Sequence, residues 1–272
     1  MNPRSWPLRW ELSRWQALGH RPRLWLRDDD ARQPGAALDR LLALCAVHGV
    51  PCAIAAIPDG PLGTLARRLR AEAGVTALQH GADHRNRRAA GEPSGEFAPD
   101  NTAATIRPLL AAGTARFRDA FPAAPPAFVP PWNALHPALP ALLREQGFTS
   151  LSAHGGPPAI EQGLRRLDVH LDLLRWKGGP RARPRAVLAR QLRQALRARR
   201  RAGRFRQPIG VLTHHLVQDE ESWTHLDWLL RLPGLQWLSF SRALESGFAD
   251  AAPFAVMATG EIFPGSAHGT PS

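Results

Sequence analysis

The sequence predicts an α/β protein that folds as a single (β/α) barrel, a distorted seven- or eight-stranded TIM-like barrel. Short apolar runs alternate with longer segments of helical periodicity along most of the chain, which is typical of repeated βα units. About eight apolar runs of strand type are present, with a helical pattern between most pairs. A length of 272 residues suits one barrel better than two small domains.

The first half of the chain contains the clearest repeats. Apolar residues three or four positions apart mark its helices, and Gly49 and Gly74 follow the first two as helix ends. The expected elements are a strand at 23–26, a helix at 37–49, a strand at 51–58, a helix at 61–74, a strand at 75–81 and a helix at 101–121. The polar, aperiodic stretch 85–100 is expected to be a long loop, and long loops in compact domains are often functional.

The second half continues the alternation. Leu188, Leu192 and Leu196 form the apolar stripe of a strongly basic helix, and Ser222 is expected to cap a later one. The expected elements are strands at 125–133, 148–153, 164–174, 208–216 and 235–240, and helices at 136–147, 183–203 and 222–234.

The domain boundaries follow from this pattern. Residues 1–22 are expected to pack on the barrel, residues 23–248 to form it, and residues 249–272 to be a poorly ordered tail, because that segment is small, Pro-bearing and aperiodic.

Composition restricts the class of protein. The formal charge is +12, but nearly all the cations are arginine, and Lys177 is the only lysine. This composition indicates a coding bias, so the positive charge is weak evidence for any function. Cys45 and Cys52 lie in apolar runs and are expected to be buried free thiols. The first 23 residues contain no uninterrupted apolar core of signal-peptide length, and nowhere do about 18 consecutive apolar residues appear. The sequence therefore predicts a cytoplasmic protein without a membrane span.

Aspartate and histidine residues collect where the expected strands end. In a (β/α) barrel the carboxyl ends of the strands meet at one face, and chemistry is located there. The stretches that follow strand ends are DDD (28–30), HGADH (80–84), PPWN (130–133), HLD (170–172) and THH (213–215).

These residues favour a metal site. His80 and His84 are four positions apart, and one added carboxylate gives three ligands with room for water or substrate. Zinc is the first expectation, although such a set also suits Co, Mn, Ni or Fe. Simpler interpretations exist: the Asp triplet would suit a helix N-terminus, and His170 would suit a hydrogen-bonded core histidine.

The ordered series RDDD, HGADH, FVPPWN, HLDLLRW and LTHH resembles the motifs of the polysaccharide deacetylases, the NodB-homology or carbohydrate esterase family four proteins. The resemblance spans roughly residues 23–240. It implies a metal-dependent hydrolase in which the second Asp of a pair and both histidines hold the metal. The first Asp is then the general base, and a later histidine protonates the leaving group.

Carried over to this chain, the resemblance implies Asp29 as base and Asp30, His80 and His84 as ligands, with Ala31 in the small position after the pair. The alternative register takes Asp28 as base and Asp29 as ligand. The acid is His214, although His214 and His215 alternate along a strand and either could face the site. Substrate contacts are expected from Trp132, Asn133, His170, Asp172 and Trp176.

Two departures from the family pattern matter. The fourth motif is only loosely met, because Asp172 and Trp176 are spaced unusually. The other departure concerns the third motif. An arginine of the third motif pairs with the base in the family, and here Val129 stands in its place. Another cation would have to replace it, and Arg27 and Arg175 are the candidates.

The expected function is removal of an acyl group, N-acetyl in first place, from a small carbohydrate or related amide. A catalytically silent barrel that binds a ligand is the alternative, and Val129 supports it. Nucleic-acid binding through the basic segment 181–206 is the weaker rival, because no known nucleic-acid motif is present, and we expect no nucleic-acid partner. The sequence leaves the oligomeric state open.

Overall fold

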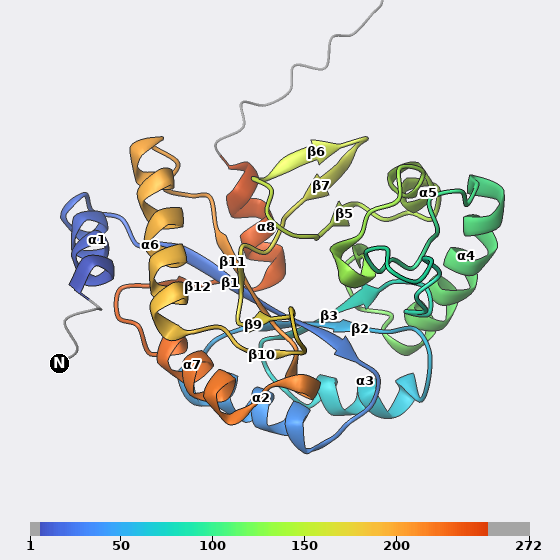
Figure 1. Ribbon diagram of the computed structural model, residues 1–272, viewed down its shortest axis with the longest axis horizontal. Helices are drawn as coiled ribbons and strands as arrows, with labels where there is room; N and C mark the ends of the chain where they lie inside the picture. Colours follow the sequence, from blue (N-terminus) through green and yellow to red (C-terminus); the bar gives the residue numbers. More distant parts are fainter. Residues whose placement is uncertain (1–5, 250–272) are drawn as a thin grey trace, which may run out of the picture.

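Parallel strands form the centre of the molecule, and helices surround the curved sheet (Figure 1). The structure is a computed structural model that describes residues 6–249. Its helices are α1 (Trp6–Ala17), α2 (Ala36–His48), α3 (Leu62–Arg70), α4 (Ala103–Ala120), α5 (Leu139–Glu145), α6 (Arg185–Arg201), α7 (Glu220–Leu230) and α8 (Phe240–Phe248), with short 3₁₀ helices η2 (Pro131–Asn133) and η3 (His215–Val217). Its strands are β1 (Arg23–Ala31), β2 (Cys52–Ala56), β3 (Val75–His80), β4 (Ala127–Val129), β5 (Ser150–Leu151), β6 (Ala159–Glu161), β7 (Leu164–Arg166), β8 (Leu171–Asp172), β9 (Leu174–Arg175), β10 (Arg181–Ala182), β11 (Ile209–Thr213) and β12 (Gln236–Trp237).

The sheet closes into a ring through one bent segment. The strand order is β6-β7-β5-β4-β3-β2-β1-β11-β8, so β7 and β8 stand near opposite edges although only residues 167–170 separate them. The N–H of Val169 donates to Ala153 O, just beyond β5, and the next N–H, of His170, donates to Gly210 O in β11. Residues 164–172 therefore act as one strand that joins both edges. The predicted distorted barrel is confirmed, with seven strand positions in the ring.

Side-chain alternation along β1 separates an inner core from an outer one. Trp25 belongs to the cluster inside the barrel, where it packs edge-on against Phe240 of α8 at 5.5 Å between ring centroids. Leu24 and Leu26 belong to the outer cluster beneath the helices. Because successive side chains of a strand point to opposite faces, Arg27 continues the inward series toward the carboxyl end of the strand.

Helix α1 packs against the outside of the barrel on α6. Trp15 is buried and meets Phe205 edge-on at 5.2 Å between centroids, and Glu11 forms an ion pair with Arg200 at 2.6 Å. The expected tail is residues 249–272, and all of it from residue 250 onward lies outside the described residues. Within residues 6–249, none of the helices has both the length and the apolar character needed to cross a membrane. Both cysteines are buried and free, as expected.

Several expected strands are shorter or divided in the structure, and the expectation fails most clearly at three places. Strand β1 extends through the whole Asp triplet to Ala31 instead of ending at residue 26. Helix α7 begins at Glu220, and its cap is Asp219, whose side chain accepts the N–H of Ser222; Ser222 was expected to cap. The strand expected at 235–240 is only Gln236–Trp237, because Ser239 caps α8 and starts a helix there.

Candidate active site

A bulge at the end of β1 sets the direction of the aspartates. Asp28 pairs with Ile54 of β2 and Ala31 pairs with Ala56, so Asp29 and Asp30 together face the single residue between them on β2. Asp30 has a φ of 75°, a left-handed conformation that is uncommon outside glycine. Such a bulge redirects a side chain that strict alternation would send to the other face. The interpretation of the triplet as a helix cap is wrong, because α2 begins after Gly35 with no side-chain cap.

The structure brings Asp30, His80 and His84 together. Asp30 Oδ1 lies 3.1 Å from His80 Nε2 and 3.0 Å from His84 Nε2, and the three ligand atoms lie within 4.8 Å of one another. Ligand atoms around a tetrahedral zinc ion stand about 3.3 Å apart, from metal–ligand distances of about 2.0–2.1 Å. The three atoms therefore need only small shifts to coordinate one cation.

Hydrogen bonding prepares His80 for this role. Its Nδ1 lies 3.0 Å from Val129 O, and because a carbonyl can only accept, Nδ1 carries the proton and Nε2 is left for a ligand bond. Burial alone would raise the pKa of Asp30, but hydrogen bonds to His80 and His84 hold that pKa far below its usual range. A bound cation would replace these hydrogen bonds by bonds from Asp30, His80 and His84 to the metal.

His84 is positioned by a buried carboxylate that the sequence did not reveal. Glu96 accepts backbone N–H groups from Ala82 at 2.8 Å, Asp83 at 2.8 Å and His84 at 2.6 Å. A Cβ on Gly81 would stand 2.5 Å from the same carboxylate, so only glycine fits there. Burial raises the pKa of Glu96. The long loop 85–100 thus shapes the turn that presents His84, whose φ is 58°.

We predict that Glu96→Gln weakens zinc binding about 10- to 100-fold, a loss typical of residues that support metal ligands. All three N–H groups donate to Oε1 of Glu96, and a glutamine oxygen there would carry no negative charge, while its NH₂ would stand where Oε2 accepts from Ala82 at 3.0 Å. The turn that holds His84 is therefore weakened. Titration with zinc against a chromophoric chelator measures the effect. Glu92→Gln, an exposed change in the same loop, is the matched control, and equal zinc affinity in the two variants would refute the role of Glu96.

Arg27 and Asp29 form a buried ion pair inside the barrel. Arg27 Nε lies 2.9 Å from Asp29 Oδ1, and one terminal nitrogen of Arg27 donates to Asp29 Oδ2 at 2.9 Å. The same guanidinium donates to Asn133 Oδ1 at 2.7 Å and to Ser152 O at 2.9 Å. Arg27 is fully buried and Asp29 is 2% exposed. The cation missing at Val129 is therefore supplied from β1, two residues before the proposed base.

The other candidate cation does not take this place. Arg175 is exposed on β9, and Val129 packs in the apolar cluster inside the barrel. The structure thus selects Arg27 from the two arginines that the sequence offered as replacements.

The two neighbouring histidines after β11 separate. His215 Nδ1 pairs with Asp28 Oδ1, and Asp28 Oδ2 accepts from Thr213 Oγ1 at 2.6 Å, all three residues being buried. Burial alone would lower the pKa of His215, but the Asp28 carboxylate raises it. His214 lies apart from this cluster and meets the ring of Trp176 edge-on at 4.7 Å. Because Asp28 and His215 are engaged with each other, the pair Asp29 and Asp30 with His214 fits the site best.

Two partly exposed tryptophans flank the site from different elements. Trp132 of η2 is 40% exposed and stacks at an angle on His84, 4.4 Å between ring centroids. Trp176 is 46% exposed and donates its indole N–H to Asp172 Oδ2 at 2.7 Å. Asp172 therefore holds Trp176 in place.

His170 is not brought to this cluster. Its Nδ1 lies 3.0 Å from the N–H of Gly210 and its Nε2 lies 3.0 Å from a guanidinium nitrogen of Arg199 on α6. Protonation of Nδ1 would break the hydrogen bond from Gly210 and set two N–H groups against each other. Burial and the charge of Arg199 lower the pKa of His170 to about 3. We therefore replace the expected substrate contact by the simpler interpretation, a histidine that belongs to the core of the fold.

His170 makes the stability of the protein depend on pH. The unfolded chain takes up a proton at this residue near pH 6.5 and the folded protein only near pH 3, so stability from this group is complete above pH 6.5 and falls as the pH drops. Between pH 7 and pH 5 we expect a loss of about 2 kcal/mol. Urea unfolding at the two pH values measures it. His170→Asn, which can still accept from Gly210, should lose most of this difference; an equal difference in the variant would contradict the assignment.

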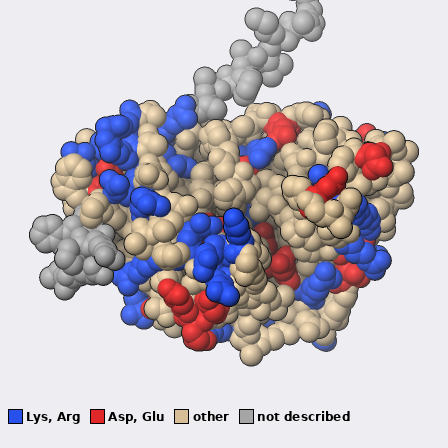
Figure 2. All heavy atoms as spheres, in the orientation of Figure 1, with Lys and Arg blue, Asp and Glu red and all other residues tan. Residues whose placement is uncertain are grey.

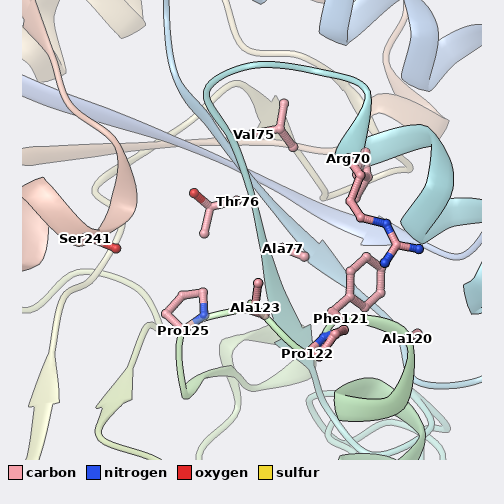
Figure 3. A pocket seen from close by; sticks show the side chains of 12 residues that line it. Arg70, Val75, Thr76, Ala77, Ala120, Phe121, Pro122, Ala123, Pro125 and Ser241 are labelled. Atoms are coloured by element: carbon pink, nitrogen blue, oxygen red, sulfur yellow. The ribbon is translucent and has the colours of Figure 1, made fainter.

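A separate hollow of about 350 Å³ lies at the opposite end of the barrel (Figure 3). Its lining comes from the end of α3, from the start of β3 at Val75 and from Ser241 in the first turn of α8. His80 is the last residue of β3, so the hollow and the metal-ligand cluster lie at opposite ends of the same strand. Arg70 is its one charged residue, and the lining is mainly apolar. We place no chemistry there.

Comparison with known proteins supports the fold. The sequence matches no protein-family model, and the search of curated proteins found no relative. Among solved structures, a Mycobacterium smegmatis protein assigned as a polysaccharide deacetylase superposes with a TM-score of 0.58 at 18% identity, over 85% of this chain and 91% of that one.

Two further structures resemble the chain. A family 4 carbohydrate esterase from Streptomyces lividans, solved with acetate, gives a TM-score of 0.51 at 14% identity over 80% of this chain and 92% of that one. A pseudoenzyme of the same family from Bacillus anthracis gives 0.52 at 14% identity over 84% and 66% of the two chains. The chain therefore has the fold shared by the polysaccharide deacetylases and the family 4 carbohydrate esterases.

Proposed function

We propose that the protein is a metal-dependent hydrolase that removes an acyl group, N-acetyl in first place, from a carbohydrate or a related amide. The observation that supports this most is the convergence of Asp30, His80 and His84 on one point at the carboxyl ends of β1 and β3, with Asp29 next in the chain. The fold supports it, because solved proteins of this fold include a family 4 carbohydrate esterase that holds acetate.

Asp30, His80 and His84 would hold the metal, and their one-oxygen, two-nitrogen donor set suits zinc first and Co, Mn, Ni or Fe as well. When bound, such an ion polarises an acyl oxygen and lowers the pKa of a coordinated water toward neutrality. Val129 O and Glu96 fix the two histidines for this purpose.

Asp29 would act as the general base that removes a proton from the attacking water. Its two oxygens are fixed by Arg27, so the carboxylate does not have to reorient when it accepts the proton. His214 would donate a proton to the departing nitrogen, because an amine leaves poorly as an anion. His214 is 8% exposed, and its Nδ1 has no hydrogen-bond partner among the described residues.

Trp132 and Trp176 would form the apolar walls against which a sugar ring or acyl group packs. Each is in ring contact with a residue of the proposed machinery, Trp132 with His84 and Trp176 with His214. Asp172 would contribute by holding Trp176 in position, and Asn133 by accepting a hydrogen bond from Arg27.

A silent ligand-binding barrel is the second candidate. The likeness to a family pseudoenzyme and the valine at position 129 favour it. The buried contact of Arg27 with Asp29 argues for activity, because Arg27 supplies the cation that is absent at position 129.

Elemental analysis combined with an acetate-release assay on N-acetylated amino sugars tests the proposal. We expect close to one equivalent of transition metal per chain and release of acetate by the wild type. His84→Ala should lose both. Stoichiometric metal without acetate release from any N-acetylated or O-acetylated sugar would favour the silent barrel, and absence of metal binding would overturn the proposed site.

A further inference from the structure

The hairpin of β9 and β10 presents two arginines side by side. Arg175 and Arg181 are register partners in this antiparallel pair, as are Leu174 and Ala182. Leu174 and Ala182 are buried, whereas both arginines are exposed, so the arginines share the outer face of the ribbon. Like charges directly opposite each other on a sheet are destabilising. An anion bound between the two arginines would remove this repulsion.

Asp219 approaches the hairpin, where its Oδ2 accepts the N–H of Ala182 at 3.1 Å, but it forms no ion pair with either arginine. Between residues 6 and 249, no ion pair or side-chain hydrogen bond involves Arg175, Arg181 or Lys177, which lies in the loop between them. Segment 173–183 contains no Asp or Glu. Some exposed arginines form ion pairs, as Arg40 does with Glu220, whereas others within residues 6–249, such as Arg190 and Arg197, form none. Figure 2 shows the result as a positively charged surface at the centre of the view, over β9 and β10.

The hairpin is fixed next to the proposed catalytic residues. Trp176, which follows Arg175 directly, is held by Asp172 and contacts the ring of His214. Arg183 donates to the carbonyl of Leu174 at 2.8 Å and so ties the two strands together. An anion bound by the arginines would therefore stand beside the tryptophan that forms one wall of the site.

We infer that Arg175, Arg181 and Lys177 form an anion subsite and that the substrate is an acylated sugar that carries a phosphate group. This rests on the proposed function. A phosphate has a charge of about −1.5 to −2 and three acceptor oxygens, which match two guanidinium groups and an ammonium. A single carboxylate would neutralise only one of the three cations. Arginine also binds phosphate in a bidentate manner.

The test compares N-acetylglucosamine with its 6-phosphate, using the wild type and the double variant Arg175→Gln/Arg181→Gln. Binding of the phosphate ester is measured by calorimetry and hydrolysis by acetate release. We expect the double variant to bind the phosphate ester about 10- to 100-fold more weakly and to lose kcat/KM for it by a similar factor. Turnover of the uncharged sugar should change less than about twofold, because neither arginine contacts the proposed base, acid or metal ligands and the uncharged sugar offers them no anion.

The control is Arg190→Gln/Arg197→Gln on α6, which removes the same two charges from exposed positions. If both double variants weaken binding equally, the effect comes from net charge and the subsite is refuted. Wild-type binding of the phosphate ester by the hairpin variant also refutes it. Selective binding that depends on the hairpin, without acetate release from either sugar, would leave the subsite standing and overturn the proposed function.

Discussion

Replacing Asp29 with asparagine should slow acyl hydrolysis by about 10²- to 10⁴-fold, the usual contribution of a general base, while the protein keeps its metal. The amide of asparagine cannot accept the proton of the attacking water. It still offers an oxygen to Arg27, but the buried guanidinium loses its counter-charge, so urea unfolding is used to show that the variant is folded under the assay conditions. Acetate release gives the rate, and elemental analysis of the same preparation gives the metal content.

Asp30→Asn provides the contrast, because Asp30 is the carboxylate that both histidine rings contact at 3.0 and 3.1 Å. That variant should lose metal and activity together. If Asp29→Asn instead loses the metal and Asp30→Asn keeps it, the register of the aspartates is wrong. Full activity in Asp29→Asn would remove Asp29 from the mechanism.

The repeat of strands and helices could be predicted from the sequence because it depends on local periodicity. Strands β2 and β11 are buried, mainly apolar runs, and the stripe of α6 is visible as leucines four residues apart. Closure of the barrel could not be predicted in this way. It depends on the segment 164–172 changing partners from β5 to β11, and partner choice is a property of tertiary structure.

The candidate site, too, could be predicted only in part from the sequence. Strand-end positions identified His80, His84 and the aspartate triplet, but they could not choose among the three aspartates. That choice depends on the β-bulge and on the positive φ of Asp30. Four of the five non-glycine residues with positive φ among residues 6–249 belong to the site, namely Asp30, His84, Trp132 and Asn133. Strained conformations of this kind gather at functional sites and have no sequence signature in non-glycine residues.

Glu96 was missed because its partners are backbone N–H groups. A motif search compares side chains, and the nearest side chain that Glu96 serves is His84, 12 positions earlier in the chain. The one available indication was a loop too long for a simple connection.

The second large effect concerns Arg27, whose replacement by methionine should lower the free energy of unfolding by about 3–5 kcal/mol. Asp29 would then remain buried without the guanidinium that contacts both of its oxygens. The carbonyl and hydroxyl of Ser152 would also lose their donor. Urea unfolding at pH 7 measures the loss, and Arg175→Met at an exposed position should change stability by less than about 0.5 kcal/mol.

A double variant distinguishes the unpaired charge from the lost packing. In Arg27→Met/Asp29→Asn no carboxylate is left uncompensated, so we expect the double variant to be more stable than Arg27→Met alone, since removing both members of a buried pair costs less than removing one. If the two variants are equally unstable, the guanidinium serves the carbonyls around β5 and not Asp29. In that case the valine at position 129 would mark a true loss of the family's paired base, and the silent barrel would become the better description of this protein.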